Sequence, residues 1–492
     1  MSKLYVLLIL LSYSLQVSAN YFEFTPLATE AYEKAMSLRF EEARKDLEQL
    51  RSDEPQNTIV HFIENYIDFF TIFINEDKSE FKRLERNKNP RLKAIRKGDR
   101  NSPYYLYCQA EIKLQWALAR LKFEQYFNAF NEVSSAYKLL KRNQKKFPDF
   151  IANKKSLGIL HAMVGTVPDN YKWGVKLLGG MTGTIEQGRK EVEEVLTYAK
   201  TNDFLFEEET LVMYAFLMLH LKNDLDEAWE IIQSDKLNPK SNPLVCFSFG
   251  NIAMRTGRIE EAINILENRP VGQQYFKFRF LDYMLGLSKL YRLDQDADVY
   301  LKKYVDNFNG QNYIKEAYQK LAWHYLVHGS EAKYKEYITY ARSRGAKVIG
   351  GDKSAEKEAK SEKVPHTLLL KARLLFDGGY YERARDLLKG KSLADFYNQK
   401  NQLEFTYRLG RINHNLGYHY EAIANYQTTI DRGRYATYYF ACNAALQIGL
   451  IHEMYEDKAK AKEFFKLCLD IDPEEYQRSL HQKAKAGLNR LK

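Results

Sequence analysis

Small residues recur along this chain at a spacing that predicts pairs of antiparallel helices. In the stretch from Ala445 to Pro473, Gly449 stands twelve residues before Ala461, and the large apolar Phe465 follows one helical turn later. The small residues would let the two backbones approach closely while the aromatic ring fills the seam, and the proline would end the second helix. The stretch therefore predicts one helical hairpin with an apolar inner face and polar turns.

The same spacing occurs at four other places, which predicts an array of hairpins. The further pairs are Ala31 with Ala43, Gly250 with Ala262, Ala372 with Ala384, and Gly410 with Ala422. Only 11 prolines and 25 glycines interrupt the 492 residues, which is too few for an all-β protein with many turns. We expect an all-α solenoid of antiparallel helix hairpins.

Two segments depart from the repeating pattern. Residues 158–188 contain seven glycines in the text GILHAMVGTVPDNYKWGVKLLGGMTGTIEQG, which predicts an embedded Gly-rich helical hairpin followed by a helix that Thr184 caps. Residues 350–365 are charged and poor in apolar side chains, which predicts an exposed linker. The predicted domains are a degenerate solenoid over 20–349 and regular repeats with a terminal capping helix over 366–492.

Residues 1–19 have the pattern of a secretory signal peptide. Lys3 provides the charged start, residues 4–11 (LYVLLILL) form a short apolar core, and Val17–Ala19 offers small residues for cleavage before Asn20. The apolar run is too short to span a bilayer, and no later run reaches the necessary length. We therefore expect an exported protein, either periplasmic or secreted.

The charge balance leaves two interpretations of the surface. The formal net charge is +10, which fits either an acidic partner or a lysine-rich solvated surface. The chain has no run of five or more basic residues, and this absence together with the export pattern argues against nucleic acid. We expect a protein or peptide partner, and peripheral contact with a membrane stays open, as does the oligomeric state.

The motifs that usually carry catalysis are absent from the sequence. It contains no Walker lysine motif, no G-x-S-x-G, no C-x-x-C and no H-E-x-x-H. His324 and His328 lie four residues apart, so both could reach one metal, but no third ligand is evident. We expect no enzyme activity, no catalytic residue, no metal and no cofactor.

The first helices of the last repeats supply a candidate peptide groove. Counting from Gly410 and its equivalents, the groove-facing positions are Arg373, Tyr407, Arg411, His414 and Asn443. Arginines, a phenol and an amide could hold an acidic or C-terminal peptide by charge-assisted hydrogen bonds. The alternative is that these residues form only the solvated side of the helices.

The Gly-rich hairpin supplies a second candidate. Its apolar residues without matching charges are Pro168, Trp173, Leu177, Leu178 and Met181. They could form the lid or membrane-dipping wedge of a lipid or small-ligand carrier, which would be a different class of protein from a scaffold. The alternative is a structural plug, because glycines also allow close helix packing.

Two of the four cysteines are expected to face each other. If Gly449 opposes Ala461 in the last hairpin, then Cys442 opposes Cys468 by the same geometry. In an exported protein such a pair could form a disulfide, and the alternative is that both are buried small hydrophobes.

The repeats resemble the tetratricopeptide (TPR) superfamily, over most of 28–345 and clearly over 366–492. The layout is also similar to a group of exported TPR proteins from bacteria of the Bacteroidota type, on the segment GTVPDNYKWGVKLLGGMTGT. The same segment is distantly similar to a Gly-rich turn in the eukaryotic inclusion-body-clearance family of TPR proteins. These resemblances imply a TPR-like α-solenoid with an embedded Gly-rich hairpin. The repeat pattern together with the signal peptide predicts an exported, non-enzymatic scaffold for protein–protein contacts at the cell envelope. The resemblances carry over no catalytic residue.

Overall fold

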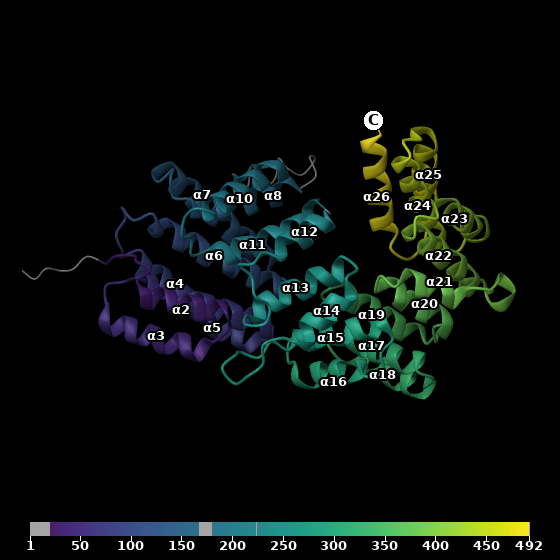
Figure 1. Cartoon of the computed structure of the whole chain (residues 1–492), viewed down its shortest axis with the longest axis horizontal. Coiled ribbons are helices and arrows are strands. Elements are labelled where there is room, and N and C mark those ends of the chain that lie inside the picture. Colours follow the sequence, from purple (N-terminus) through teal and green to yellow (C-terminus); the bar gives the residue numbers. More distant parts are fainter. Residues whose placement is uncertain (1–19, 167–179, 223, 492) are drawn as a thin grey trace, which may run out of the picture. The chain divides into compact units, whose positions relative to one another are not determined.

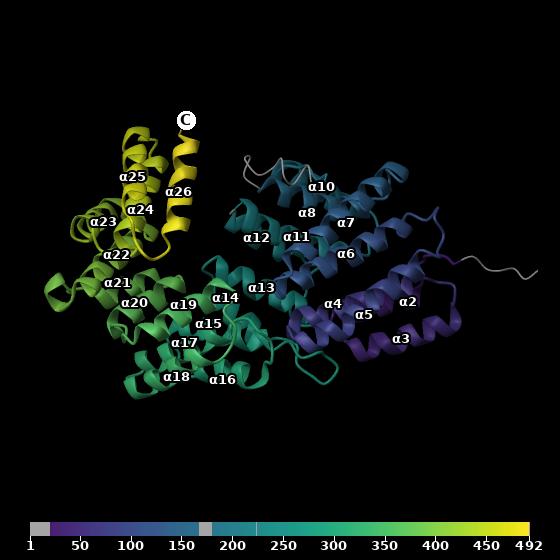
Figure 2. The same ribbon diagram turned by 180° about the vertical axis from the view of Figure 1, so that it is seen from behind.

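The computed structural model describes residues 20–166, 180–222 and 224–491 (Figure 1). Within these ranges the regular structure is helical, apart from one isolated β-bridge between Tyr21 and Asn57. Successive helices pair as hairpins, which Figure 2 shows from behind. The prediction of an all-α, TPR-like helical repeat is therefore confirmed. Across the described ranges, none of the helices combines the length and apolar character that crossing a membrane demands.

The chain divides into two compact units. Unit 1 comprises the chain up to residue 256 together with 261–281 and 307–312, and unit 2 comprises 257–260, 282–306 and the chain from 313. The helices that lie wholly in unit 1 are α2 (Pro26–Met36), α3 (Phe40–Asp53), α4 (Ile59–Asn75), α5 (Lys78–Ile95), α6 (Tyr104–Lys122), α7 (Tyr126–Lys146), α8 (Ala152–Gly165), α10 (Ile185–Ala199), α11 (Glu207–Leu217), the π-helical turn η1 (Met218–Lys222), α12 (Leu225–Ile232) and α13 (Pro243–Arg255).

The second half of the chain contains the more regular hairpins. Helices with residues in both units are α14 (Ile259–Glu267), α15 (Phe280–Arg292) and α16 (Ala297–Asn307). The elements of unit 2 that follow are α17 (Ile314–Val327), α18 (Glu331–Ser343), α19 (Gly350–Ser361), α20 (Thr367–Asp377), α21 (Tyr381–Leu388), the 3-10 turn η2 (Leu393–Asp395), α22 (Gln399–Asn415), α23 (His419–Gly433), α24 (Phe440–Met454), α25 (Lys458–Asp470) and α26 (Gln477–Arg490).

In unit 2 the repeat glycines lie against aromatic rings of the partner helix. A β-carbon on Gly410 would lie 2.5 Å from the ring of Tyr426, and one on Gly449 would lie 2.6 Å from the ring of Phe465. The sequence pattern pairs each glycine with an alanine. Ala461 is indeed fully buried, but the ring one turn further on is the group that contacts the glycine, because it is long enough to reach across the seam.

In unit 1 the Gly-rich segment allows α8 and α10 to pack closely. A β-carbon on Gly188 would lie 2.2 Å from the carbonyl oxygen of Gly158, so the two backbones touch without an intervening side chain. The predicted cap of α10 is confirmed, because the Thr184 hydroxyl accepts a hydrogen bond from the Gln187 amide at 3.0 Å.

The segment 350–365 differs from the expected exposed linker, since most of it forms α19. This helix packs against α17 and α18 with a stripe of small residues, and Asp352, Ala355 and Ala359 are buried. Asp352 accepts hydrogen bonds from the amides of Tyr313 (2.8 Å) and Glu316 (3.0 Å) and thereby caps the start of α17. A helix without large apolar residues can dock because its buried face is small enough to lie close to its neighbours. The domain bounds themselves stay a prediction.

Candidate functional site

Three of the five predicted groove residues form one hydrogen-bonded group in unit 2. Tyr407 of α22 is 1% exposed, and its hydroxyl accepts hydrogen bonds from Arg411 Nη1 (3.1 Å) and from Asn443 Nδ2 of α24 (2.7 Å). Successive first helices thus join at the tyrosine, which orients both donors. The contact of α22 with α24 shows how the repeat spacing brings side chains far apart in the sequence together.

Arg411 has no acidic partner within the described part of the chain. Its guanidinium lies over the ring of Phe376 on α20, 4.8 Å from the ring centre. The electron-rich face of the ring attracts the cation. Its Nε is buried and has no hydrogen-bond partner. A buried donor without an acceptor carries a desolvation cost, and no ion pair offsets it here.

The two neighbouring arginines are already paired. Arg373 of α20 lies 4.7 Å from the ring centre of Trp323 and 3.5 Å from the carboxylate of Asp377. Arg408 of α22 binds Glu404 at 2.9 Å. We call Arg373, Arg408 and Arg411 the arginine row. Among its members, Arg411 is the one without a carboxylate partner in the described part of the chain.

His414 lies beside the arginine row rather than within its hydrogen-bonded group. Its Nδ1 is 3.5 Å from the hydroxyl of Tyr426. Burial lowers the pKa of His414 to about 4, and the neighbouring His419 and Arg411 act in the same direction. His414 is therefore neutral at pH 7 and offers a hydrogen bond but no charge to an anion.

Sequence reasoning missed Arg408, which belongs to the row, and Trp323, which lies against Arg373. Arg408 lies three residues before Arg411, so helical spacing alone places both on one face of α22. Trp323 gave no such signal, because it belongs to α17 and its contact with Arg373 depends on the packing of unit 2. Whether the five predicted residues bind a peptide stays a prediction.

The cysteine geometry follows the expected opposition. Cys442 and Cys468 are both fully buried, their sulfurs are 3.6 Å apart, and the Cys442 thiol donates to the Cys468 carbonyl oxygen at 3.4 Å. Both are free thiols in this structure. Contact with the Cys442 thiol and burial raise the pKa of Cys468 far above its usual range, which keeps that thiol protonated. The disulfide stays a prediction.

Most of the predicted apolar hairpin lies outside the described residues. This applies to Pro168, Trp173, Leu177 and Leu178. Met181, which is described, is 4% exposed and belongs to the hydrophobic core of unit 1. The described part of the candidate thus contributes to packing.

His324 and His328 come together as expected from their spacing, with ring centres 4.5 Å apart. His324 Nε2 lies 3.7 Å from Asp298, and burial and the neighbouring His328 lower the pKa of His324 to about 4. Among the described residues, no group of three or more His, Cys, Asp and Glu side chains could hold a metal ion.

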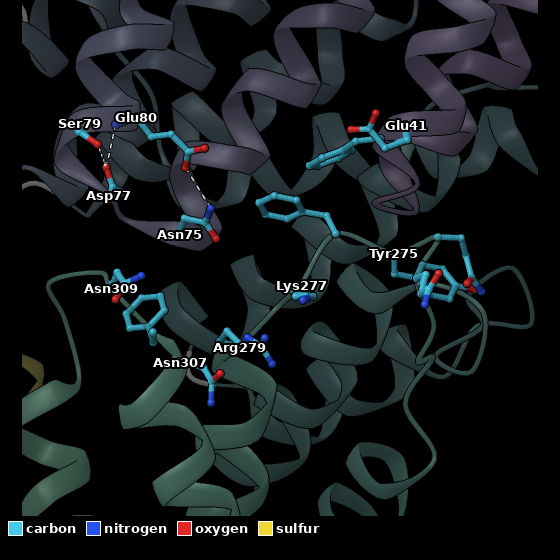
Figure 3. Close-up of a pocket in the computed structure, with 15 residues that line it drawn as sticks. Glu41, Asn75, Asp77, Ser79, Glu80, Tyr275, Lys277, Arg279, Asn307 and Asn309 are labelled. Atoms are coloured by element: carbon cyan, nitrogen blue, oxygen red, sulfur yellow. Dashed lines mark hydrogen bonds between the residues drawn. The ribbon is translucent and has the colours of Figure 1, made fainter.

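Unit 1 contains a polar hollow of about 640 Å³ (Figure 3). One wall carries Asp77 and Glu80 at the start of α5, and Lys277 and Arg279 approach from the segment that leads to α15. The acidic groups are engaged locally: Asp77 accepts hydrogen bonds from Ser79 Oγ and the Glu80 amide, and Glu80 accepts one from Asn75 at 3.0 Å. Their charges therefore serve the cap and turn before α5.

Comparison with known proteins identifies the last hairpin. A family model described as tetratricopeptide repeat matches residues 443–475, which span most of α24 and α25. No curated protein sequence matches the chain. Among solved structures, one chain from "Structure of Naa15/Naa10 bound to HypK-THB" is similar over 95% of this chain and 66% of its own length, at 15% identity and a TM-score of 0.26.

The match and the fold define a helical-repeat protein with at least one tetratricopeptide repeat, the stretch that is also clearest in the sequence. Stacked repeats of this type form extended surfaces that bind other proteins. The fold thus indicates the class of protein-interaction scaffolds, which generally act without catalysis.

Proposed function

We propose that unit 2 binds an acidic segment of a protein partner at the arginine row. The observation that carries this proposal is the guanidinium of Arg411, which has no carboxylate partner among the described residues. Arginine presents its donors as a planar fork that matches a carboxylate, so an Asp, Glu or C-terminal carboxylate would satisfy the free side of the guanidinium. Tyr407 and Phe376 hold the fork in place before the ligand arrives.

The setting of this activity is also a proposal. The pattern of residues 1–19 supports export, and the repeat fold supports a scaffold without catalysis. We propose that the protein works at the cell envelope, where it holds an acidic region of another protein. Comparing the N-terminus of the mature protein with Asn20 by mass spectrometry tests the export step.

A fluorescein-labelled hexaglutamate peptide with a free C-terminus tests the binding site. Fluorescence anisotropy should show that the Arg411→Met variant binds this probe at least about tenfold more weakly, because it loses a charge-assisted fork. Arg432→Met is the matched control, because Arg432 is exposed on α23. The affinity of this variant for the probe should stay within about twofold of that of the unchanged protein.

Two results would contradict the proposal. One is the absence of any anisotropy change with the unchanged protein at low salt, where charge pairing is strongest. The other is an equal loss of affinity in Arg411→Met and Arg432→Met, since that would show that the probe senses net charge rather than this arginine.

A further inference from the structure

Unit 1 contains a second, larger and open hollow, with a volume of about 940 Å³. It lies between α2, the residues just before α8, the turn that leads into α11, and the loop that leads into α13. A hollow of this size is in the range of small-molecule sites. None of the residues singled out from the sequence lines it.

Aromatic rings form one continuous wall of this hollow. The wall includes the rings of Phe24, Tyr32, Tyr104, Phe150, Phe204 and Phe206. The centre of the Phe24 ring is 6.0 Å from that of Tyr32, 5.6 Å from that of Tyr104 and 5.9 Å from that of Phe206. Such a wall accepts methylene groups and attracts a cation placed over a ring face.

Carboxylates dominate the polar lining. The acidic residues are Glu33, Asp149, Asp203, Glu207, Glu208 and Glu209. The basic lining residues are Arg39 and Lys236, and each already pairs with an acid, Arg39 with Glu42 at 3.4 Å and Lys236 with Glu207 at 3.6 Å. A chain with a net charge of +10 thus has a local excess of negative charge in an aromatic hollow.

Several of these carboxylates lack a cationic partner in the part of the chain that the structure describes. Glu33 on α2 and Glu208 on α11 make no ion pair there. Burial raises the pKa of Glu208, and the negative charges of Glu33 and Glu207 raise it further. Mutual repulsion of this kind is relieved when a cation binds between the carboxylates.

A buried network lies beneath the wall and connects to it through Glu209. One oxygen of Glu209 accepts hydrogen bonds from Tyr32 (3.3 Å) and Tyr66 (3.2 Å) and pairs with Lys155 at 3.0 Å. Lys155 also binds Glu111 at 3.2 Å, so one ammonium serves two carboxylates. Burial raises the pKa of Glu111, and Glu209 also lines the hollow.

We propose that this hollow binds an aliphatic polyamine, with its ammonium groups at the carboxylates and its methylene groups against the aromatic wall. The carboxylates are spread along the lining, from Asp149 before α8 to Glu33 on α2, and no three acidic groups in the described ranges converge to hold a metal ion. That distribution fits several charges separated along a chain better than one compact ion. The inference is independent of the proposed peptide site in unit 2.

Isothermal titration calorimetry with spermidine on the full mature chain tests the proposal. The Glu33→Gln/Glu208→Gln double variant should bind spermidine at least about tenfold more weakly, because both unpaired charges are lost. The matched control is Glu186→Gln/Glu230→Gln, which removes the same charge at two exposed positions of unit 1 outside the hollow, and its affinity should stay within about twofold.

The aromatic wall is tested at its rim. Tyr198 is 40% exposed, lines the hollow and lies 6.3 Å from the ring centre of Phe204. Tyr198→Ala should weaken spermidine binding about threefold, and Tyr198→Phe should restore it, because the ring rather than the hydroxyl contacts the ligand.

Three outcomes would overturn the proposal. The first is the absence of spermidine binding at about 1 mM, a concentration that a weak specific site would detect. The second is an equal loss in the Glu33→Gln/Glu208→Gln variant and its control. The third is calcium chloride binding with the same dependence on these variants and at higher affinity than spermidine, which would identify a site for a compact inorganic cation.

Discussion

Lys155 in unit 1 and Arg411 in unit 2 are held in opposite ways. In unit 1, Lys155 is wholly buried and forms ion pairs with both Glu111 and Glu209, which compensate its positive charge inside the protein. In unit 2, Arg411 lies against Phe376 and Tyr407 and meets no carboxylate among the described residues. Similar helical hairpins therefore support an acidic hollow in one unit and a free guanidinium in the other.

This difference shows that the charge available to a ligand depends on which charged side chains lack an ion-pair partner within the protein. Unit 1 is lined by an acidic excess although the chain as a whole carries a net charge of +10. Unit 2 has several arginines, yet ion pairs engage Arg373 and Arg408 and leave Arg411. The number of charged residues indicates neither the acidic lining of unit 1 nor the unpaired Arg411 of unit 2. Both depend on which ion pairs form.

The largest expected effect comes from removing the shared cation of unit 1. Lys155→Met should lower the free energy of unfolding by about 3 to 5 kcal/mol, because it leaves two buried carboxylates without their counter-charge. Arg411→Met in unit 2 should cost less than about 1 kcal/mol, since no ion pair is broken. Urea unfolding followed by circular dichroism measures both.

The comparison would fail if the two variants lost similar stability. Adding Glu111→Gln and Glu209→Gln to the Lys155→Met variant should recover part of the loss, because the uncompensated charges are then gone. A triple variant that is less stable than Lys155→Met would indicate that packing around the lysine stem, rather than charge, dominates.

The next effect concerns the glycine contacts. Gly188→Ala in unit 1 should cost about 2 to 3 kcal/mol, because the new methyl group meets a backbone carbonyl that cannot move aside. Gly410→Ala in unit 2 should cost less, since it meets the side-chain ring of Tyr426 rather than backbone. Thermal unfolding of both, with Gly350→Ala as a control in open space, ranks them, and the reverse order would contradict this reasoning.

Unit 2 should also carry a specific acid sensitivity. The folded-state pKa of His324 is about 4 against an ordinary value of 6.5, so the unfolded chain binds the proton more readily. His324 therefore contributes stability that is present above pH 6.5 and is lost as the pH falls towards 4. Between pH 6.5 and pH 4, the free energy of unfolding should fall by about 1 to 3 kcal/mol less in the His324→Gln variant than in the unchanged protein. Identical pH profiles in urea unfolding would refute it.

The smallest effect is expected at the hollow of unit 1. Glu208→Gln should leave the stability unchanged or raise it by about 0.5 kcal/mol or less, because it relieves repulsion from Glu33 and Glu207. Thermal unfolding measures the change. A clear loss of stability would mean that Glu208 serves the fold and is not held for a ligand.

Much of the fold of unit 2 could be predicted because its signals are local. The spacing of Gly410 from Ala422 predicts a hairpin, and the repeat length then brings Tyr407 and Asn443 to neighbouring positions on successive first helices, where they form a hydrogen bond of 2.7 Å. The same reasoning places Cys442 opposite Cys468. Each inference needs one hairpin and its neighbour.

The hollow of unit 1 could not be predicted in this way. Glu33 and Glu208 come from α2 and α11, and nothing in the local pattern of either helix indicates that they line one space. Helix α19 was missed for another reason. Its buried face consists of Asp352, Ala355 and Ala359, and a search for large apolar residues does not recognise such a face.

The docking of α19 has a spectroscopic consequence. Glu358 on this helix accepts hydrogen bonds from the indole Nε1 of Trp323 (2.7 Å) and from Gln319 (2.6 Å) of α17 and from Tyr334 of α18 (3.1 Å). Trp323 is one of four tryptophans and is 2% exposed. Detachment of α19 would hydrate the indole and shift its emission to longer wavelength. The fluorescence of Trp323 therefore reports whether α19 is docked on α17 and α18.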